Sequence, residues 1–483
     1  MTKQKGEKVN FGEKQLVYLG GSFAPNCLML DYDEERIIID CGIEVLPKRK
    51  GKPNYKLPDF TALKDGKQIT AVLITHMNID HSAGVAGLAP YLSKDAKILA
   101  PTQTIMALPD ILKEQMELSL QEGLISFNRF QIANINSRRH IIEGPGLFKV
   151  SPHSKIEIYA NSAGHIPGAA YYIFYLPNGT KGIVTGDMSF HNQPIVNGAK
   201  FLSETLPKEM LPNEIWSNDE TYPGGLEENN GFKTADSSEH YKNEMERLYN
   251  DCKKTLENGR WAILLALSMG RAQNLAVYLA EKGLTPYLDG ASRKYLNLFS
   301  DFKWSENDID FSAKGIIKIK NEKMRKELLL SKKPNIYITT SGMGDFGPAP
   351  EYLKETIPKK GCLIGVANWS PYESLISRLL RATQAKKESF TLNGEYMILL
   401  PLLADVIKYA CTGHCSGTDN IKFIEDMVTA RELPLNMIIL DHGENKTKSL
   451  MAKVLREKKL ARDILMSHQN LTINLCHRPN YYN

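Results

Sequence analysis

The chain is organised around the stretch Ala71-Val-Leu-Ile-Thr-His-Met-Asn-Ile-Asp-His81, in which an apolar run leads into four potential metal ligands. Alternate residues of an extended chain point to the same side, so His76, Asn78 and Asp80 can converge. His81 opens the helix that is predicted for the residues after it. Because imidazole and carboxylate groups at this spacing suit zinc or a similar divalent ion, the stretch predicts a metal site at the end of a buried strand.

Two further residues of ligand type follow predicted strands later in the chain. His165 stands in Ser162-Ala-Gly-His-Ile-Pro-Gly-Ala-Ala170, and Asp187 stands in Val184-Thr-Gly-Asp-Met-Ser189. Each residue alone would be interpreted as an ordinary loop histidine or turn aspartate. Their position at strand ends, in order after the first cluster, favours the metal-binding interpretation.

Length and composition predict a soluble globular protein of two domains. The 483 residues exceed one ordinary core, and 42% hydrophobic and 24% charged content is typical of globular proteins. No apolar run approaches the ~18 residues of a membrane helix, and the first residues lack a secretory signal, so a cytoplasmic location is expected. The net charge of +5 is compatible with an anionic substrate but does not indicate one.

The cysteines predict reduced thiols, because seven of them are scattered along the chain without a framework. Cys411, His414 and Cys415 could form a small zinc site instead. This alternative is less favoured, since the spacing supplies too few ligands and no nearby residue completes them.

The pattern of predicted strands and helices changes twice along the chain, which predicts an inserted domain. Residues 1–222 are rich in short strands, whereas residues 223–410 alternate helix and strand in the pattern of a parallel sheet covered by helices. Residues 411–483 again show the strand pattern of residues 1–222. They end in a helix, predicted over 446–465, and a tail. That helix carries seven Lys and Arg residues, for which a solvated face is favoured over an RNA contact.

Three additional motifs complete a family resemblance. They are Ser217-Asn-Asp-Glu-Thr-Tyr222, Thr412-Gly-His-Cys-Ser-Gly417 and Leu440-Asp-His-Gly-Glu444. With the first cluster, which resembles the His-x-His-x-Asp-His signature of the metallo-β-lactamase superfamily, they make the chain similar to β-CASP nucleases. That group includes bacterial ribonuclease J and the pre-mRNA 3′-end cleavage nuclease. The resemblance implies an αββα sandwich interrupted by an inserted β-CASP α/β domain with a mainly parallel sheet. Asn78 departs from the signature, which has histidine there.

The resemblance also implies a role for each matched residue. One metal would be held by His76, His165 and Asp187, with Asn78 at the fourth position. A second metal would be held by Asp80, His81, His442 and the shared Asp187. The implied catalytic residues are His414 as general acid, Asp219 as the carboxylate that orients it, and Asp80; the implied substrate-binding residues are Ser341 and Gly342. Two Zn²⁺ ions per chain are expected, with Mn²⁺ or Mg²⁺ as alternatives because an amide at position 78 favours harder ions.

The leading functional hypothesis is a metal-dependent ribonuclease that hydrolyses phosphodiester bonds, preferably in single-stranded RNA, through a two-metal site. Asn78 motivates one alternative, a weakly active or inactive β-CASP scaffold that binds RNA or a nuclease partner. A small-molecule metallo-hydrolase is the other. The sequence leaves open exonuclease against endonuclease, DNA as a substrate, and a homodimer; no membrane partner is expected.

Overall fold

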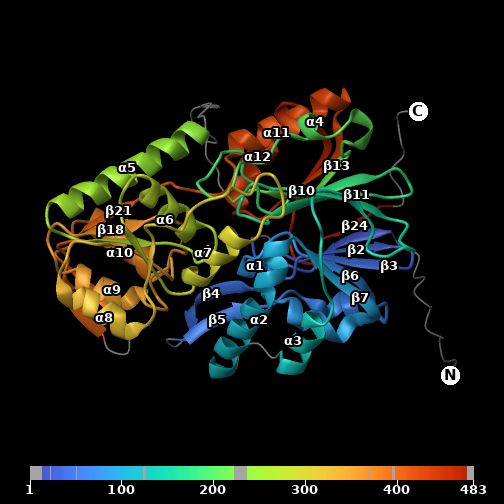
Figure 1. Ribbon diagram of the computed structural model, residues 1–483. Coiled ribbons are helices and arrows are strands. Elements are labelled where there is room, and N and C mark those ends of the chain that lie inside the picture. The colour runs from blue at the N-terminus through green and yellow to red at the C-terminus, as the bar shows by residue number, and fades with distance from the viewer. Residues whose placement is uncertain are drawn as a thin grey trace, which may run out of the picture.

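The computed structural model describes residues 14–21, 23–49, 52–122, 127–221, 237–368, 370–393 and 397–475. Within these residues, two seven-stranded sheets form a sandwich and a six-stranded sheet lies beside it (Figure 1). The sandwich therefore makes one part of the molecule, and the third sheet with its helices makes the other.

The first sheet of the sandwich holds the organising strand, β6 (Ile69–Leu73), in its interior. Its strands, in spatial order, are β24 (Thr472–Asn474), β1 (Gln15–Tyr18), β2 (Leu28–Tyr32), β3 (Glu35–Ile39), β6 (Ile69–Leu73), β7 (Leu92–Ala100) and β8 (Arg139–Ile141). β6 pairs in parallel with β3 and β7. Strands that are covered on both faces are apolar throughout, which explains the unbroken run that precedes His76.

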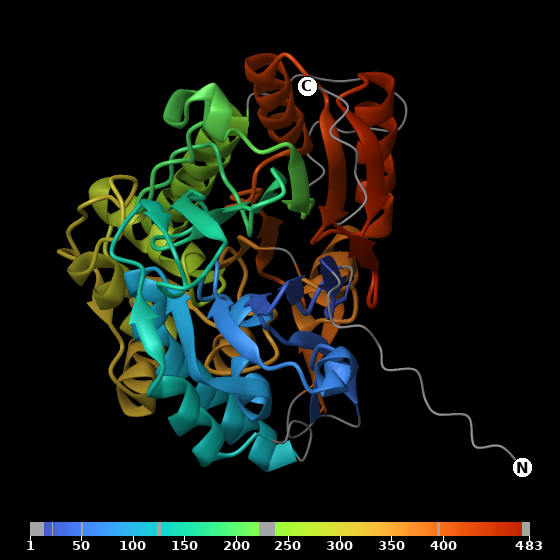
Figure 2. The ribbon, with the colours of Figure 1, turned by 90° about the vertical axis from the view of Figure 1, so that its right-hand side faces the viewer.

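The second sheet carries the other strand ends that matter for the site. Its strands, in spatial order, are β23 (Ala461–Met466), β22 (Leu435–Asp441), β13 (Glu214–Asp219), β12 (Lys181–Val184), β11 (Ala170–Tyr175), β10 (Glu157–Ser162) and β9 (Gly146–Phe148). Buried residues of the two sheets, such as Leu30 and Ile37 from one and Tyr172 and Ile439 from the other, form a common core. β24 pairs with β1, so the C-terminal segments stand beside the N-terminal strands (Figure 2).

The third sheet is built from chain that runs between two neighbouring strands of the second. In spatial order it contains β16 (Ile317–Lys318), β15 (Pro286–Asp289), β17 (Ile336–Thr339), β14 (Ala262–Leu265), β18 (Leu363–Val366) and β21 (Asp405–Lys408). All of its described pairs are parallel. β13 and β22 are adjacent and parallel although this whole sheet separates them in sequence, so the chain makes an insertion there.

Helices cover the outer faces of all three sheets. In Figure 1, α2 and α3 lie outside the first sheet and α4, α11 and α12 outside the second, while α5 to α10 surround the third. The bounds are α1 Ile79–Ser82, α2 Thr102–Glu122, α3 Arg129–Asn136, α4 Leu202–Thr205, α5 Ser237–Glu257, α6 Arg271–Glu281, α7 Ser292–Asp301, α8 Glu322–Ser331, α9 Ala349–Thr356, α10 Leu375–Gln384, α11 Gly417–Arg431 and α12 Asn445–Glu457. Two hairpins complete the fold: β4 (Glu44–Arg49) with β5 (Lys52–Lys56), and β19 (Ser389–Asn393) with β20 (Met397–Pro401). No helix in the described part of the chain is long and apolar enough to cross a bilayer.

Two predicted helices differ from the structure. The helix after His81 is instead the short α1, which already contains His81, followed by a 3-10 segment at Val85–Tyr91. The helix predicted over 446–465 is α12 followed by strand β23, because the chain turns at Lys459 with a positive φ of 54° and then pairs with β22. Lys448 of α12 is fully buried, so it does not belong to a solvated face.

The predicted domain limits stay predictions. The strands of the third sheet run from Ala262 to Lys408, within the predicted insert of 223–410. The limit between residues 222 and 223 lies outside the described residues.

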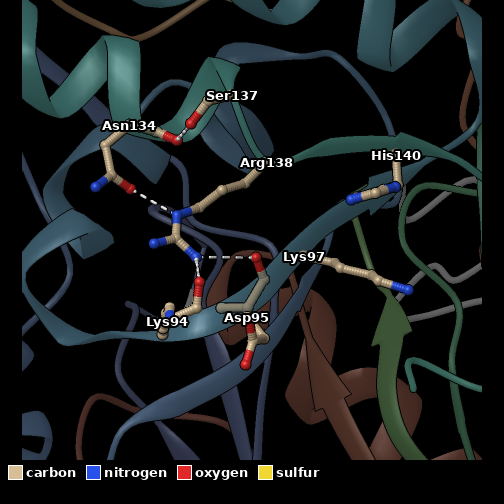
Figure 3. A pocket seen from close by; sticks show the side chains of 8 residues that line it. Lys94, Asp95, Lys97, Asn134, Ser137, Arg138 and His140 are labelled. Carbon is tan, nitrogen blue, oxygen red and sulfur yellow. Dashed lines mark hydrogen bonds between the residues drawn. The ribbon is translucent and has the colours of Figure 1, made fainter. Parts of the chain in front are cut away.

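A pocket of about 460 Å³ opens beside β7 and the turn from α3 to β8 (Figure 3). Its central side chain is Arg138, whose Nε donates to Asn134 Oδ1 at 2.9 Å. Its Nη1 donates to the carbonyl oxygens of Ser93 and Lys94 at 2.9 and 2.7 Å. Arg138 therefore closes the turn, and none of the residues that line this pocket is one of the predicted site residues.

Candidate metal centre

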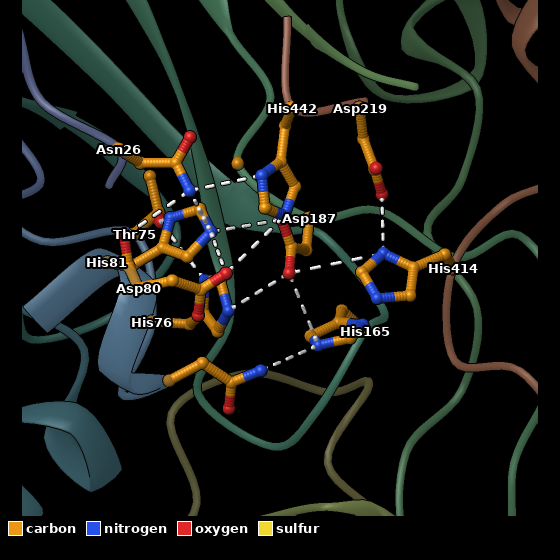
Figure 4. Close-up of polar contacts among 12 residues, drawn as sticks. Asn26, Thr75, His76, Asp80, His81, His165, Asp187, Asp219, His414 and His442 are labelled. Atoms are coloured by element: carbon orange, nitrogen blue, oxygen red, sulfur yellow. Dashed lines mark hydrogen bonds and ion pairs between the residues drawn. The ribbon is translucent and has the colours of Figure 1, made fainter. Parts of the chain in front are cut away.

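Asp187 lies at the centre of a cluster of buried histidines (Figure 4). The cluster comes from separate strand ends: His76 follows β6, His165 follows β10, Asp187 follows β12 and His442 follows β22. Because these ends meet at one edge of the sandwich, residues up to 366 positions apart in sequence approach one carboxylate. The structure thus brings together the histidines and the aspartate that the sequence singled out.

The two oxygens of Asp187 face different sets of side chains. Oδ1 lies 3.1 Å from His81 Nε2 and 3.0 Å from His442 Nε2. Oδ2 lies 3.3 Å from His76 Nε2 and 3.6 Å from His165 Nε2. We therefore call the surroundings of His81 and His442 the Oδ1 side of Asp187, and the surroundings of His76 and His165 its Oδ2 side.

Asp80 and Asn78 distinguish these two sides. Asp80 belongs to the Oδ1 side, with Oδ2 at 3.7 Å from His442 Nε2 and 3.9 Å from His81 Nε2. Asn78 belongs to the Oδ2 side, where its Nδ2 lies 3.3 Å from His165 Nε2. Asn78 precedes α1 at the N-cap position but makes no capping bond with its side chain. Its amide is thus free to face the cluster, and rotation about the last side-chain bond exchanges the nitrogen for the oxygen.

The donor set fits divalent cations. Nε2 of His76 and Oδ1 of Asp187 are buried without a hydrogen-bond partner, which is unusual for polar atoms in a protein interior. In each of two groups, His76 with His81 and Asp187, and Asp80 with His81 and His442, one ligand atom per residue lies within 4.8 Å of the others. Imidazole nitrogens and carboxylate oxygens in such groups are the ligands of zinc and similar ions.

The charges in the cluster favour a cation on the Oδ1 side. Burial opposes the charged form of His442, but Asp187 outweighs it and raises the pKa of His442 to about 10. Burial opposes the charged form of His81 as well, but Asp187, Asp40 and Asp80 raise its pKa well above the usual range. On the Oδ2 side, burial and neighbouring histidines lower the pKa of His76 and of His165. Positive charge is therefore held more strongly around Oδ1.

His414 stands at the rim of the cluster with Asp219 behind it. Its Nδ1 lies 2.9 Å from Asp219 Oδ2, and it is the most exposed of the five histidines, with 20% of its side chain accessible. Burial opposes its charge, but Asp219 and then Asp187 outweigh burial and raise the pKa of His414. Asp219 also accepts hydrogen bonds from the backbone N–H groups of Met188 and Thr221, which fix its carboxylate.

Sequence reasoning missed the residues that orient the histidines. Asp40 Oδ2 lies 2.7 Å from His81 Nδ1, and the same carboxylate accepts hydrogen bonds from the N–H and the hydroxyl of Thr75. The carbonyl oxygen of Gly413 lies 2.8 Å from His165 Nδ1. Such partners leave Nε2 facing the cluster. The signal for Asp40 was its place at the end of an apolar strand next to β6.

Asn26 and Gly42 shape the Oδ1 side from the neighbouring strands. Asn26 Nδ2 lies 3.0 Å from His81 Nε2 and 3.1 Å from His442 Nδ1. A Cβ on Gly42 would lie 1.7 Å from the carbonyl oxygen of Asp80, so only glycine lets the chain after β3 pass this close. Neither residue carries a recognisable ligand pattern in the sequence.

The two predicted substrate-binding residues belong to the inserted part of the chain, which carries the third sheet. Ser341 and Gly342 follow β17, where Ser341 Oγ accepts from Phe346 N and Gly342 O accepts from Asn368 Nδ2. The cysteine alternative finds no support, because no candidate metal cluster among the described residues contains a cysteine. Cys415 Sγ instead lies 3.3 Å from Asn420 Oδ1.

Comparison with known proteins identifies the fold and its relatives. Residues 20–207 match the family described as the metallo-beta-lactamase superfamily. The chain is 25% identical over 451 residues to transcription termination factor FttA of Methanocaldococcus jannaschii, covering 88% of this chain and 66% of the relative. It is 25% identical over 339 residues to the probable RNase MJ4 of the same organism, covering 68% of this chain and 72% of the relative. A crystal structure of a protein of unknown function from Enterococcus faecalis superposes with a TM-score of 0.55 at 13% identity, covering 96% of this chain and 100% of the other.

These matches agree with the fold. The molecule is a mixed α/β protein whose sandwich, interrupted by an additional parallel sheet, confirms the fold class that the sequence predicted. The family match over residues 20–207, together with the FttA and RNase relatives, supports the resemblance to β-CASP nucleases of the metallo-β-lactamase superfamily. It spans from 51% to 66% of the length of the first FttA relatives. The His/Asp groups of this fold support the use of divalent metal.

Proposed function

We propose that this protein is a metal-dependent ribonuclease that hydrolyses phosphodiester bonds in single-stranded RNA. The observation that carries the proposal is the division of Asp187 between two ligand sets, with the His414–Asp219 pair beside them. Two relatives, one named a probable RNase and the other a transcription termination factor, agree with RNA as the substrate. We assign His414, Asp219 and Asp80 as catalytic residues.

The metal ligands in this proposal divide between the two sides. His76, His165 and Asp187 hold one cation, with Asn78 completing the Oδ2 side. Asp80, His81, His442 and Asp187 hold the other on the Oδ1 side. When bound, two divalent cations polarise a phosphodiester and supply a nucleophilic hydroxide at neutral pH. We propose Zn²⁺ for the Oδ1 side, and Zn²⁺ or Mn²⁺ for the Oδ2 side, since an amide oxygen suits harder ions.

His414 supplies the proton that the leaving oxygen needs. Its Nδ1 faces Asp219, so the proton to be transferred is held at Nε2, on the opposite side of the ring. Asp219 keeps the ring charged and in one orientation, because a nearby carboxylate favours imidazolium. A positioned acid of this kind contributes about 10²–10⁴-fold in rate. The greater exposure of His414 than of the other four histidines lets it reach a substrate.

Cleavage of labelled single-stranded RNA by the purified full chain tests the proposal. Cleavage is expected with Zn²⁺ or Mn²⁺, to stop after thorough chelation, and to be lost in His81→Ala. His468→Ala is the matched control, because His468 is exposed and its printed hydrogen bond is to the adjacent Gln469. RNA that stays intact with the metal-loaded wild type, or cleavage that survives removal of all metal, contradicts the proposal.

A further inference from the structure

Lys448 is fully buried in α12, although it lies in a segment rich in basic residues. Its Nζ lies 3.3 Å from both the carbonyl oxygen and Oγ of Ser467. Burial lowers the pKa of Lys448, while the charges of Asp441 and Glu220 oppose that shift. A buried ammonium group is expensive to maintain without partners, so its position against Ser467, within the electrostatic influence of Asp441 and Glu220, requires an explanation.

Asp441 links Lys448 to the metal centre. It is the last residue of β22, and His442 follows it directly with a positive φ of 42°. Ser467 Oγ donates to Asp441 Oδ1 at 2.6 Å, and Ser217 Oγ donates to Oδ2 at 2.9 Å. Because both oxygens of Asp441 are held, the direction in which His442 leaves the strand is held as well.

Glu220, the second carboxylate that influences Lys448, directly follows Asp219 at the end of β13. Asp219 and Asp441 are Cα partners in the parallel pair of β13 and β22, so Glu220 follows one strand end as His442 follows the other. Asn218 Nδ2 donates to Glu220 Oε1 at 2.6 Å. A Cβ on Gly443 would lie 2.4 Å from the carbonyl oxygen of Glu220, so the two chains pass in close contact.

We propose that Lys448 is a positioning residue for the Oδ1 side of the metal centre. Through Ser467 and Asp441, its ammonium group holds the end of β22 so that His442 Nε2 stays 3.0 Å from Asp187 Oδ1. In this proposal Lys448 acts only through Ser467 and Asp441, and it does not contact the substrate. The inference rests on the proposed function, because it requires His442 to bind a cation.

Metal titration of the stripped full chain tests this role. Lys448→Met keeps the length of the side chain and removes its charge. Calorimetry with Zn²⁺ should show affinity lowered about 10–100-fold at one site, the fall typical of losing an outer partner of a ligand. That site is the one that His442→Ala abolishes. Lys453→Met, an exposed lysine of the same helix, is the matched control and should bind Zn²⁺ as the wild type does.

A rescue variant separates positioning from loss of stability. Adding Asp441→Asn to Lys448→Met removes the carboxylate that the ammonium group influences through Ser467. If the charge balance positions His442, the double variant should bind Zn²⁺ more tightly than Lys448→Met alone, and the interaction can be read as a double-mutant cycle. Melting of the metal-free variants shows which of them are folded at the titration temperature.

Unchanged Zn²⁺ affinity in folded Lys448→Met overturns the proposal. If that variant does not fold, Ser467→Ala breaks the link while leaving the lysine in place, and it should lower affinity at the same site; wild-type affinity there overturns the proposal equally. RNA cleavage separates this inference from the proposed function. A wild type that binds Zn²⁺ at both sites without cleaving RNA contradicts the nuclease, whereas the effect of Lys448 on Zn²⁺ affinity still decides the positioning role.

Discussion

The two sides of Asp187 differ in charge although they share one carboxylate. The Oδ1 side has Asp80 within 3.9 Å of its histidines and Asp40 directly behind His81. The Oδ2 side has a neutral amide, Asn78, beside His165, and His165 is oriented by a backbone carbonyl rather than by a carboxylate. Both sides are buried, so the attraction of these carboxylates is weakly screened.

Because of this difference, we expect affinity to depend mainly on the Oδ1 side and metal selectivity on the Oδ2 side. Three carboxylates around the Oδ1 side should retain a cation firmly. The Oδ2 side depends more on its neutral donors, so the kind of donor decides which ion it prefers. We expect the two sides to be separable by titration, with the Oδ2 side the first to empty.

The largest effect is expected from Asp187→Ala, because it removes the carboxylate common to both sides. Bound metal should fall to background and RNA cleavage should be lost, as measured by metal analysis of the purified variant and by labelled RNA digestion. Asp310→Ala is the control, since this carboxylate is 86% exposed and forms an ion pair with Lys303. A variant that retains one cation would show that the sides do not depend on a shared ligand.

The next effect is expected from His414→Ala, which should lower turnover by about 10²–10⁴-fold while leaving metal content near that of the wild type. The structure makes this a real test, because His414 Nδ1 is also 4.0 Å from Asp187 Oδ2 and could belong to the Oδ2 side. Single-turnover cleavage and metal analysis are measured on the same sample. Equal loss of metal and activity would make His414 a ligand.

Asp40→Asn should weaken only the Oδ1 side. Losing the partner of a ligating histidine typically lowers metal affinity about 10–100-fold. Calorimetric titration should therefore show one weakened site and one unchanged site. Asp310→Asn serves as the control for adding an amide elsewhere. Equal weakening of both sites would remove the distinction between the two sides.

The smallest effect is expected from Asn78→His, which adds a nitrogen donor to the Oδ2 side without changing the length of the loop. Zinc affinity there should rise, and the metal that best supports cleavage should shift towards zinc. Titration of both proteins, with cleavage assays across zinc, manganese and magnesium, measures the two outcomes. Unchanged affinity and preference would mean that Asn78 does not contribute a ligand.

Several residues of the candidate metal centre could be recognised from the sequence because they stand at the ends of predicted strands. His76, His165 and Asp187 were recognisable because each follows a predicted strand. Their convergence could not be derived from spacing, since His442 approaches Asp187 only after the inserted sheet has returned the chain to β22. The family resemblance supplied that link.

The residues that were missed contact the histidines across long separations in sequence. Asp40 contacts His81 across 41 positions, and Asn26 contacts His442 across 416. The helix predicted over 446–465 failed for a related reason: the turn that ends α12 uses Lys459 with positive φ, where glycine would have marked the break. The burial of Lys448 could not be predicted either, because its partner Ser467 lies 19 positions further along the chain, directly after β23.

Crystals of the full chain soaked in Mn²⁺ can locate each bound ion by its anomalous scattering. Two peaks are expected, one on each side of Asp187, about 3.5–4 Å apart as in other two-metal sites. One peak should contact His81 and His442, and the other His76 and His165. A single peak away from Asp187, or no peak in crystals of protein that cleaves RNA, would contradict the proposed two-metal site.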